Sequence, residues 1–126
     1  MITPDEYFQD SIVNFNFTPT TEDYTCASDL LDKVNALFPD CDLRSGHRTP
    51  QKVAALRAAG YKAALDSQHM HSNAVDISDP DNSRDDSLDD AKLEAAELYR
   101  EDPADTDSWV HLQRVPPGSG HRTFKP

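Results

Sequence analysis

The sequence has little cysteine, little glycine and no long hydrophobic run, and each shortage excludes a class of protein. Only 2 of its 126 residues are cysteine and 4 are glycine. Cys26 and Cys41 do not form a C-x-x-C pair, so we expect small core residues rather than a thiolate metal site or redox centre. No apolar stretch approaches the roughly 20 residues that a membrane span needs, and we therefore expect no membrane insertion.

Positive charge is also scarce. The chain has 12 Lys and Arg against 23 Asp and Glu, for a formal net charge of -11. Because such a chain is repelled by phosphate backbones and anionic membranes, nucleic acid is not expected as a partner. The first residues lack the basic and apolar regions of a signal peptide, so we expect a cytoplasmic location. Nothing in the composition indicates an oligomeric state.

Helix signals and short strand signals are mixed along the chain. Thr3-Pro4 and Thr49-Pro50 each place a cap residue before a proline at the first helical position. Apolar spacing predicts further helices from about Thr21 to Phe38 and from about Ser87 to Arg100. The segments "CDLRSG", "NAVDIS" and "WVHLQRV" are typical of strands. The order predicts a single small α+β domain with a mostly antiparallel sheet of about four strands flanked by helices.

The domain boundaries follow from these patterns. Residues 1–20 are expected to form an N-terminal segment, and residues 21–126 the domain that carries the functional site. With 126 residues, the chain is long enough for one modest hydrophobic core.

Two of the predicted strands each carry a polar residue on the face opposite their apolar residues. Alternation places Asp76 on one face of "NAVDI" and His111 on one face of "WVHLQ". If these strands are neighbours, both side chains project from the same side of the sheet, and His69 can complete a three-ligand metal site. Spacing alone does not separate His69 from His71, and it also leaves open that none of these residues binds a metal.

A resemblance to a known family separates them. The pattern S-x-H-x-x-S-x-A-x-D over residues 67–76, preceded by "SGHRTP" and followed by "WVHLQ", resembles the zinc D-Ala-D-Ala carboxypeptidases, peptidase family M15. This family includes phage endolysins that cut peptidoglycan peptides and is related to the hedgehog signalling domain. The resemblance covers roughly residues 25 to 126. It implies one Zn²⁺ ion held by His69, Asp76 and His111 on one face of the sheet, and gives His71 no ligand role.

The resemblance also implies a catalytic cleft. Arg48 would bind a substrate carboxylate or the oxyanion, unless it forms an ordinary structural ion pair. Relatives carry an acid about three or six residues before the last ligand; Ser108 stands at the first position, so Asp107 or Asp105 is expected to act as the general base. The residues expected to contact substrate are Arg48, Ser45, Gln68 and Trp109.

The function implied is that of a zinc metallopeptidase that hydrolyses peptidoglycan stem peptides, as a D-Ala-D-Ala carboxypeptidase or an endolysin-type endopeptidase. A phage or prophage protein of this kind would be located in the host cytoplasm before lysis or in the virion. One alternative is a non-catalytic zinc-binding virion or interaction protein that retains the peptidase fold. Another is a small acidic interaction protein without metal. Ser72 departs from the glycine common in the family, which is expected to alter a turn.

Overall fold

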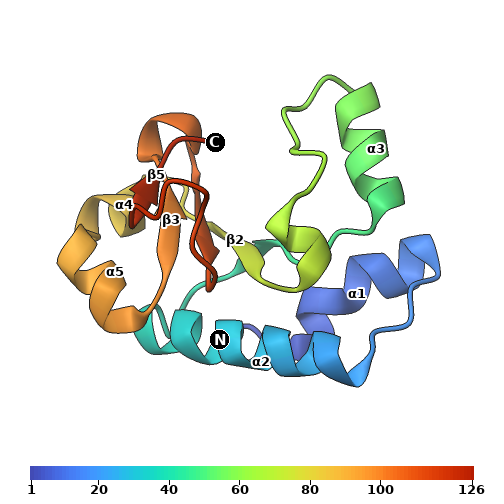
Figure 1. The fold of residues 1–126 in the computed structure, drawn as a ribbon. Helices are drawn as coiled ribbons and strands as arrows, with labels where there is room; N and C mark the ends of the chain where they lie inside the picture. Colours follow the sequence, from blue (N-terminus) through green and yellow to red (C-terminus); the bar gives the residue numbers. More distant parts are fainter.

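The computed structural model describes residues 1–126 as an α+β domain, which confirms the expected fold class (Figure 1). Its helices are α1 (Pro4–Phe15), α2 (Thr21–Leu37), α3 (Pro50–Ala58), α4 (Ser83–Ser87) and α5 (Asp90–Ala96). Two short 3₁₀ helices are η1 (Gln68–His71) and η2 (Pro103–Asp105). The strands are β1 (Leu43–Ser45), β2 (Ala74–Ser78), β3 (Tyr99–Glu101), β4 (Trp109–Gln113) and β5 (Thr123–Phe124).

The five strands form one sheet in the order β1-β2-β4-β3-β5. Only the contact between β3 and β5 is parallel. Strands β2 and β4 pair in register from Ala74–Gln113 to Ser78–Trp109. Their apolar side chains alternate onto one face and join the hydrophobic core, so the opposite face is free to carry polar groups. The core members from these two strands are Val75, Ile77, Val110 and Leu112.

The long helices begin where side-chain caps satisfy their first backbone N–H groups. The hydroxyls of Thr3, Thr20 and Thr49 accept hydrogen bonds from the first turns of α1, α2 and α3, and Thr20 forms a capping box with Asp23. In Figure 1, α1 and α2 lie beneath the sheet, while α3 stands on the side opposite α4 and α5. No helix combines the length and the apolar character needed to cross a membrane.

The N-terminal segment contributes directly to the core. Ile2, Tyr7 and Phe8 are buried in the same cluster as the sheet residues. The Tyr7 hydroxyl donates a hydrogen bond of 2.7 Å to the carbonyl of Ala74 at the start of β2. Helix α1 therefore supports the strand that carries Asp76.

The helix expected from Ser87 to Arg100 is wrong in its extent. The chain forms α4 and then α5, which begins at the cap Asp89 and ends where Glu97 adopts a left-handed conformation with φ 57°. The residues beyond this point form β3. The sequence offers no glycine at this helix end, so its usual stop signal is missing.

Candidate metal centre

Helix η1 fixes the position of His69. The Ser67 side chain caps this short helix by accepting a hydrogen bond of 3.2 Å from the His69 N–H. Ser72 ends it in a left-handed conformation with φ 59°, which explains why glycine suits this position. The Ser72 hydroxyl also donates to Asp23 of α2 at 3.1 Å. The turn is thus preserved despite the serine, and His69 is only 2% exposed.

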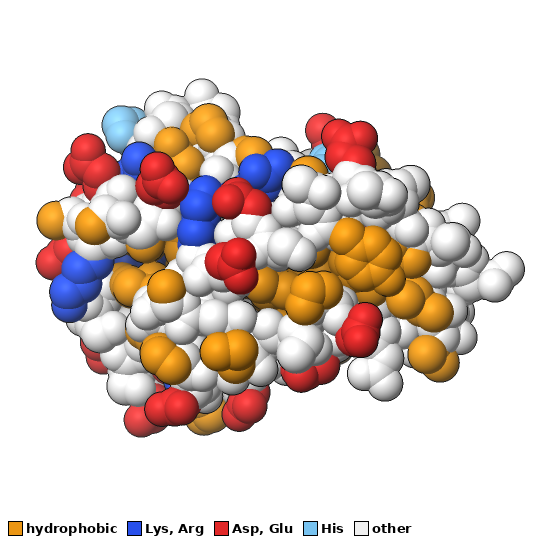
Figure 2. All heavy atoms as spheres, turned by 90° about the horizontal axis from the view of Figure 1, so that it is seen from below, with side chains coloured by type: hydrophobic (Ala, Val, Ile, Leu, Met, Phe, Trp, Pro, Cys, Tyr) orange, Lys and Arg blue, Asp and Glu red, His pale blue; other side chains and the backbone are white.

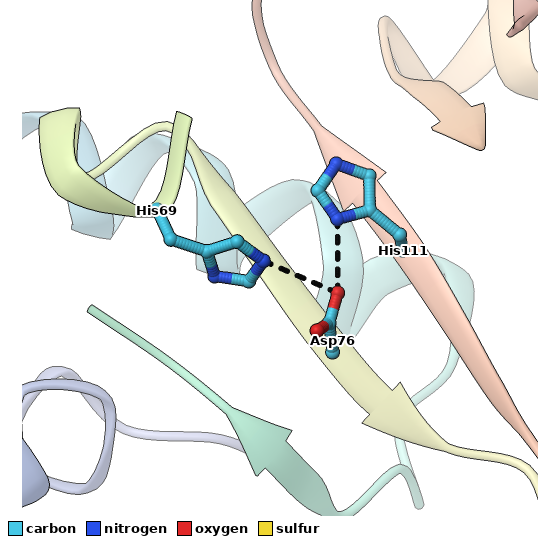
Figure 3. A group of neighbouring side chains, drawn as sticks. All are labelled: His69, Asp76 and His111. Atoms are coloured by element: carbon cyan, nitrogen blue, oxygen red, sulfur yellow. Dashed lines mark hydrogen bonds and ion pairs between the residues drawn. The ribbon is translucent and has the colours of Figure 1, made fainter. Parts of the chain in front are cut away.

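Three potential metal ligands converge on the polar face of the sheet. Asp76 of β2 and His111 of β4 are direct partners in the antiparallel register, and His69 approaches from η1 (Figure 3). One ligand atom from each residue lies within 4.8 Å of the other two. The structure therefore brings together the three residues that were expected to bind a metal.

Hydrogen bonds decide which ring nitrogens face the centre of the site. His69 donates through Nδ1 to the carbonyl of Gly46 at 2.8 Å, and its Nε2 lies 3.3 Å from Oδ1 of Asp76. His111 donates through Nε2 to the side-chain oxygen of Gln113 at 2.9 Å, and its Nδ1 lies 2.9 Å from the same Asp76 oxygen. Because both acceptors are carbonyl oxygens, each ring points its other nitrogen toward Asp76, as metal-binding histidines do.

The three side chains strongly affect one another's ionisation. Burial alone would raise the pKa of Asp76, but the charges and hydrogen bonds of His69 and His111 lower it far below its usual value. Burial lowers the pKa of His69, although the charge of Asp76 acts in the opposite direction. Burial also acts to lower the pKa of His111, but the hydrogen bond and charge of Asp76 outweigh it and raise that pKa. A metal ion would compete with a proton at His111.

Arg48 orients the carboxylate between the two histidines. Its guanidinium donates to Oδ2 of Asp76 at 3.1 Å and to the hydroxyl of Ser45 at 3.1 Å. Oδ1 of Asp76 is thereby directed at both rings, while Oδ2 is bound by the arginine. Arg48 also lines the cleft described below, so its expected contact with substrate remains a prediction.

A cleft of about 1120 Å³ opens onto Asp76. One side is formed by β1, α3 and the segment that follows α3, and the other by residues of β3, η2 and β4. The expected site residues Ser45, Arg48, Asp105 and Trp109 all line it. The Arg44 guanidinium lies 4.5 Å above the ring of Trp109. This arrangement gives the candidate metal centre an accessible side with charged groups around it.

Glu101 is a site residue that the sequence prediction missed. The β3–β4 register pairs Arg100 with Leu112, and its continuation places Glu101 beside His111. Glu101 lines the cleft and is partly buried, and burial raises the pKa of its carboxyl. The signal was the alternation in "YRE", which was hidden because that segment was assigned to a helix and the following acidic loop.

Three residues singled out in the sequence lie outside the cleft lining. The Asp107 carboxylate accepts a hydrogen bond of 3.1 Å from Asn82 and is exposed, and the Gln68 side chain accepts one of 3.3 Å from Asn73. His71 is exposed and contacts Asp66 at 2.7 Å. Of the two expected bases, Asp105 is therefore the one that lines the cleft, where it contacts Lys125 at 3.3 Å.

Comparisons with known proteins do not indicate the chemistry of this site. No family model matches the chain, and neither the curated proteins nor the solved structures contain a significant match. The geometry alone assigns His69, Asp76 and His111 as a possible metal-binding set.

Proposed function

We propose that this protein is a zinc-dependent peptidase that hydrolyses stem peptides of bacterial peptidoglycan. The observation that carries the proposal is the contact of 3.3 Å between Nε2 of His69 and Oδ1 of Asp76. Both atoms are acceptors, because the N–H of this ring is committed to Gly46. A buried imidazole lone pair that faces a carboxylate needs a cation between them.

Zinc fits the three donors better than the other common metals. Two imidazole nitrogens and one carboxylate oxygen form a typical zinc set, whereas magnesium and calcium prefer oxygen ligands alone. Tetrahedral ligands at about 2.1 Å from zinc lie about 3.4 Å from one another. The contacts of 3.3 and 2.9 Å from Asp76 to His69 and His111 are close to this spacing. Three protein ligands leave one position open, as catalytic zinc sites require.

The surrounding residues supply what a peptidase needs. A bound zinc ion would supply Lewis-acid activation of the scissile carbonyl and of water. The Glu101 carboxylate, beside His111 in a site that raises its pKa, would accept a proton from the attacking water and return it to the leaving amine. Asp105 is the second candidate for this role, because it also lines the cleft. Arg48 would hold Asp76 in place and present its remaining N–H groups to a substrate carboxylate.

The substrate class rests on the resemblance of residues 67–76, "SGHRTP" and "WVHLQ" to the zinc D-Ala-D-Ala carboxypeptidases. Either a carboxypeptidase or an endolysin-type endopeptidase is consistent with a cleft that is open to solvent at the metal centre. A phage or prophage origin, with the protein in the host cytoplasm before lysis or in the virion, belongs to the same proposal.

The test compares zinc-dependent release of peptides from purified peptidoglycan by the wild type, His69→Ala and His71→Ala. His71→Ala is a matched control because this histidine is exposed and contacts only Asp66 among charged groups. We expect His69→Ala to abolish release and His71→Ala to retain it. Chelation should stop the wild-type reaction, and added zinc should restore it.

Each other outcome has a defined meaning. Release that persists in His69→Ala would contradict the assigned metal site. Zinc binding without any release would overturn the peptidase proposal and support a non-catalytic zinc-binding virion or interaction protein. Absence of bound metal would overturn both, and would leave the acidic interaction protein.

A further inference from the structure

Charge is distributed very unevenly along this acidic chain. The segment 43–65 contains Arg44, Arg48, Lys52, Arg57 and Lys62 and no Asp or Glu. It therefore carries a formal charge of +5 within a chain of -11, so the remaining residues carry -16. Figure 2 shows the molecule from below, a face on which acidic side chains are scattered widely and Lys and Arg lie on the half away from the α3 side. The segment is the exception to an otherwise acidic surface.

The five cations share one wall of the cleft. The residues Arg44, Arg48, Lys52, Arg57 and Lys62, here called the basic wall, all line it. The wall is built from β1, α3 and the segment after α3, and in Figure 1 α3 stands on the other side of the molecule from β3 and β5. Cations grouped along one side of a cleft raise the local concentration of anions there.

Three members of the basic wall have no carboxylate partner. Lys52 contacts Asp10 at 3.6 Å, and Arg48 is bound to Asp76. By contrast, Arg44 donates to the Ser108 hydroxyl at 2.8 Å and stacks on the Trp109 ring. Neither partner carries a negative charge, so the charge of Arg44 is uncompensated.

The other two unpaired cations lie at the far end of α3. Arg57 donates to the carbonyl of Ala63 at 2.6 Å, which fixes the segment after the helix without neutralising the arginine. Lys62 is exposed and makes no hydrogen bond or ion pair. In a chain with 23 acids for 12 bases, unpaired cations that line one cleft point to a charged ligand rather than to a structural role.

We propose that the basic wall forms an anion subsite that selects peptides with a second free carboxylate, distinct from any carboxylate bound by Arg48. The inference rests on the proposed peptidase function for the identity of the ligand as a peptide. Arg57 and Lys62, at the far end of α3, bind this second carboxylate, so an otherwise identical peptide with a carboxamide at that position binds more weakly.

The dimensions of the wall suit this ligand. Helix α3 has 9 residues and is about 13 Å long, so its two ends are separated by about four residues of an extended peptide. Arg48 precedes the helix and Lys62 follows it. A stem peptide that carries one carboxylate at its C-terminus and another on an internal glutamate has charges separated on this scale.

The experiment uses two synthetic pentapeptides, L-Ala-γ-D-Glu-L-Lys-D-Ala-D-Ala, in which the chain continues through the γ-carboxyl of the glutamate and its α-carboxylate is either free or converted to the carboxamide. Binding is measured by calorimetry to the zinc-loaded Glu101→Gln chain, in which cleavage is expected to be slow. Two ion pairs of about 0.5–1 kcal/mol each predict that the free acid binds roughly five to thirtyfold more tightly. Raising the ionic strength from 0.05 to 0.5 M should remove most of the preference.

The variants locate the subsite. Arg57→Gln combined with Lys62→Gln should reduce the preference to less than about twofold, since both proposed partners are removed. Lys92→Gln is the matched control: this exposed lysine of α5 has no carboxylate partner and does not line the cleft. It should leave the preference unchanged.

Failure of the inference and failure of the proposed function give different results. Equal binding of acid and amide by a chain whose wild type cleaves both peptides would overturn the inference and leave the peptidase intact. A preference that survives loss of Arg57 and Lys62 would overturn the assigned subsite. Tighter binding of the acid by a protein whose wild type cleaves neither peptide would support anion recognition and contradict the peptidase proposal.

Discussion

The two walls of the cleft differ in charge and in how the chain builds them. The basic wall comes from one continuous segment, 43–65, whose helix stands apart from the sheet. The facing wall, here called the acidic wall, consists of Glu101 and Asp105, which are fixed by β3 and η2. Asp76 of the candidate metal centre also lines the cleft and is in contact with Arg48 of the basic wall.

Because of this difference, we expect the basic wall to bind the ligand and the acidic wall to transfer the proton. Long, exposed cations such as Arg44, Arg57 and Lys62 adapt to a charged ligand, but they contribute modestly to affinity. A carboxylate partly buried beside a metal ligand is positioned by its strand and has a raised pKa, which suits a general base. We therefore expect changes in the acidic wall to affect turnover and changes in the basic wall to affect affinity.

The largest effect is expected from Glu101→Gln. Loss of the proton acceptor should lower kcat by about 100-fold or more while zinc content is unchanged. Asp107→Asn is the matched control because its carboxylate lies outside the cleft and contacts Asn82. Steady-state kinetics on a stem peptide would check this, and full activity of Glu101→Gln would transfer the role to Asp105.

The pH dependence of the activity tests the same role of Glu101 as the general base. A base must be ionised to accept a proton, so activity should fall as pH decreases through the pKa of Glu101. Because burial raises this pKa above its ordinary value of 4.5, the fall should begin at a higher pH than for an exposed glutamate. An acidic limb at or below 4.5 would contradict the role of Glu101.

A smaller effect, on stability, is expected where the basic wall meets α1. A Cβ atom at Gly46 would lie 2.2 Å from the carbonyl oxygen of Tyr7, and this backbone cannot easily move. Gly46→Ala should therefore destabilise the fold by roughly 2–4 kcal/mol and lower Tm by about 10 °C. Gly118→Ala, which meets nothing within 4 Å, should leave Tm nearly unchanged in the same thermal melts. Equal melting of the two variants would contradict the tight contact.

The sequence predicted which residues form the candidate metal centre better than it predicted their surroundings. Alternation along "NAVDI" and "WVHLQ" correctly placed Asp76 and His111 on one face, because the period of a strand fixes which side chains share a face. The close contact of Gly46 with Tyr7 could not be predicted, since it joins residues far apart in the chain. The role of the N-terminal segment in supporting β2 was missed for the same reason.

Glu101 was missed for a local reason. The residues after Ala96 continue the apolar spacing of α5, and the helix ends only because Glu97 adopts a left-handed conformation that the sequence does not signal. Asp107, four residues before His111, was one of two expected bases, but its side chain contacts Asn82. The spacing of Glu101 and Asp107 along the sequence therefore did not show where either side chain points.

The smallest effect concerns a buried acid behind the acidic wall. Asp85 is 2% exposed, accepts from Thr106 at 3.4 Å and lies 3.5 Å from Arg100, and burial raises its pKa from 3.8 to about 6. The Asp85 carboxyl thus binds a proton more tightly in the folded state than in the unfolded state. The stability that it contributes is present below pH 4 and is lost as pH rises through about 6.

Replacing this acid should remove that pH dependence. Asp85→Asn should raise the free energy of unfolding at pH 7 by about 1–2 kcal/mol relative to wild type, with little gain at pH 4. Asp86→Asn, an exposed neighbour, is the control and should change neither value. Denaturant unfolding at both pH values would check this, and a gain that is equal at pH 4 and pH 7 would contradict it.

The central claim is that His69, Asp76 and His111 hold one zinc ion. Elemental analysis of the purified chain after dialysis tests it most directly. The account predicts about one zinc per chain for the wild type and for His71→Ala, and almost none for His69→Ala. A wild type without zinc, or a His69→Ala chain that retains it fully, would contradict the account.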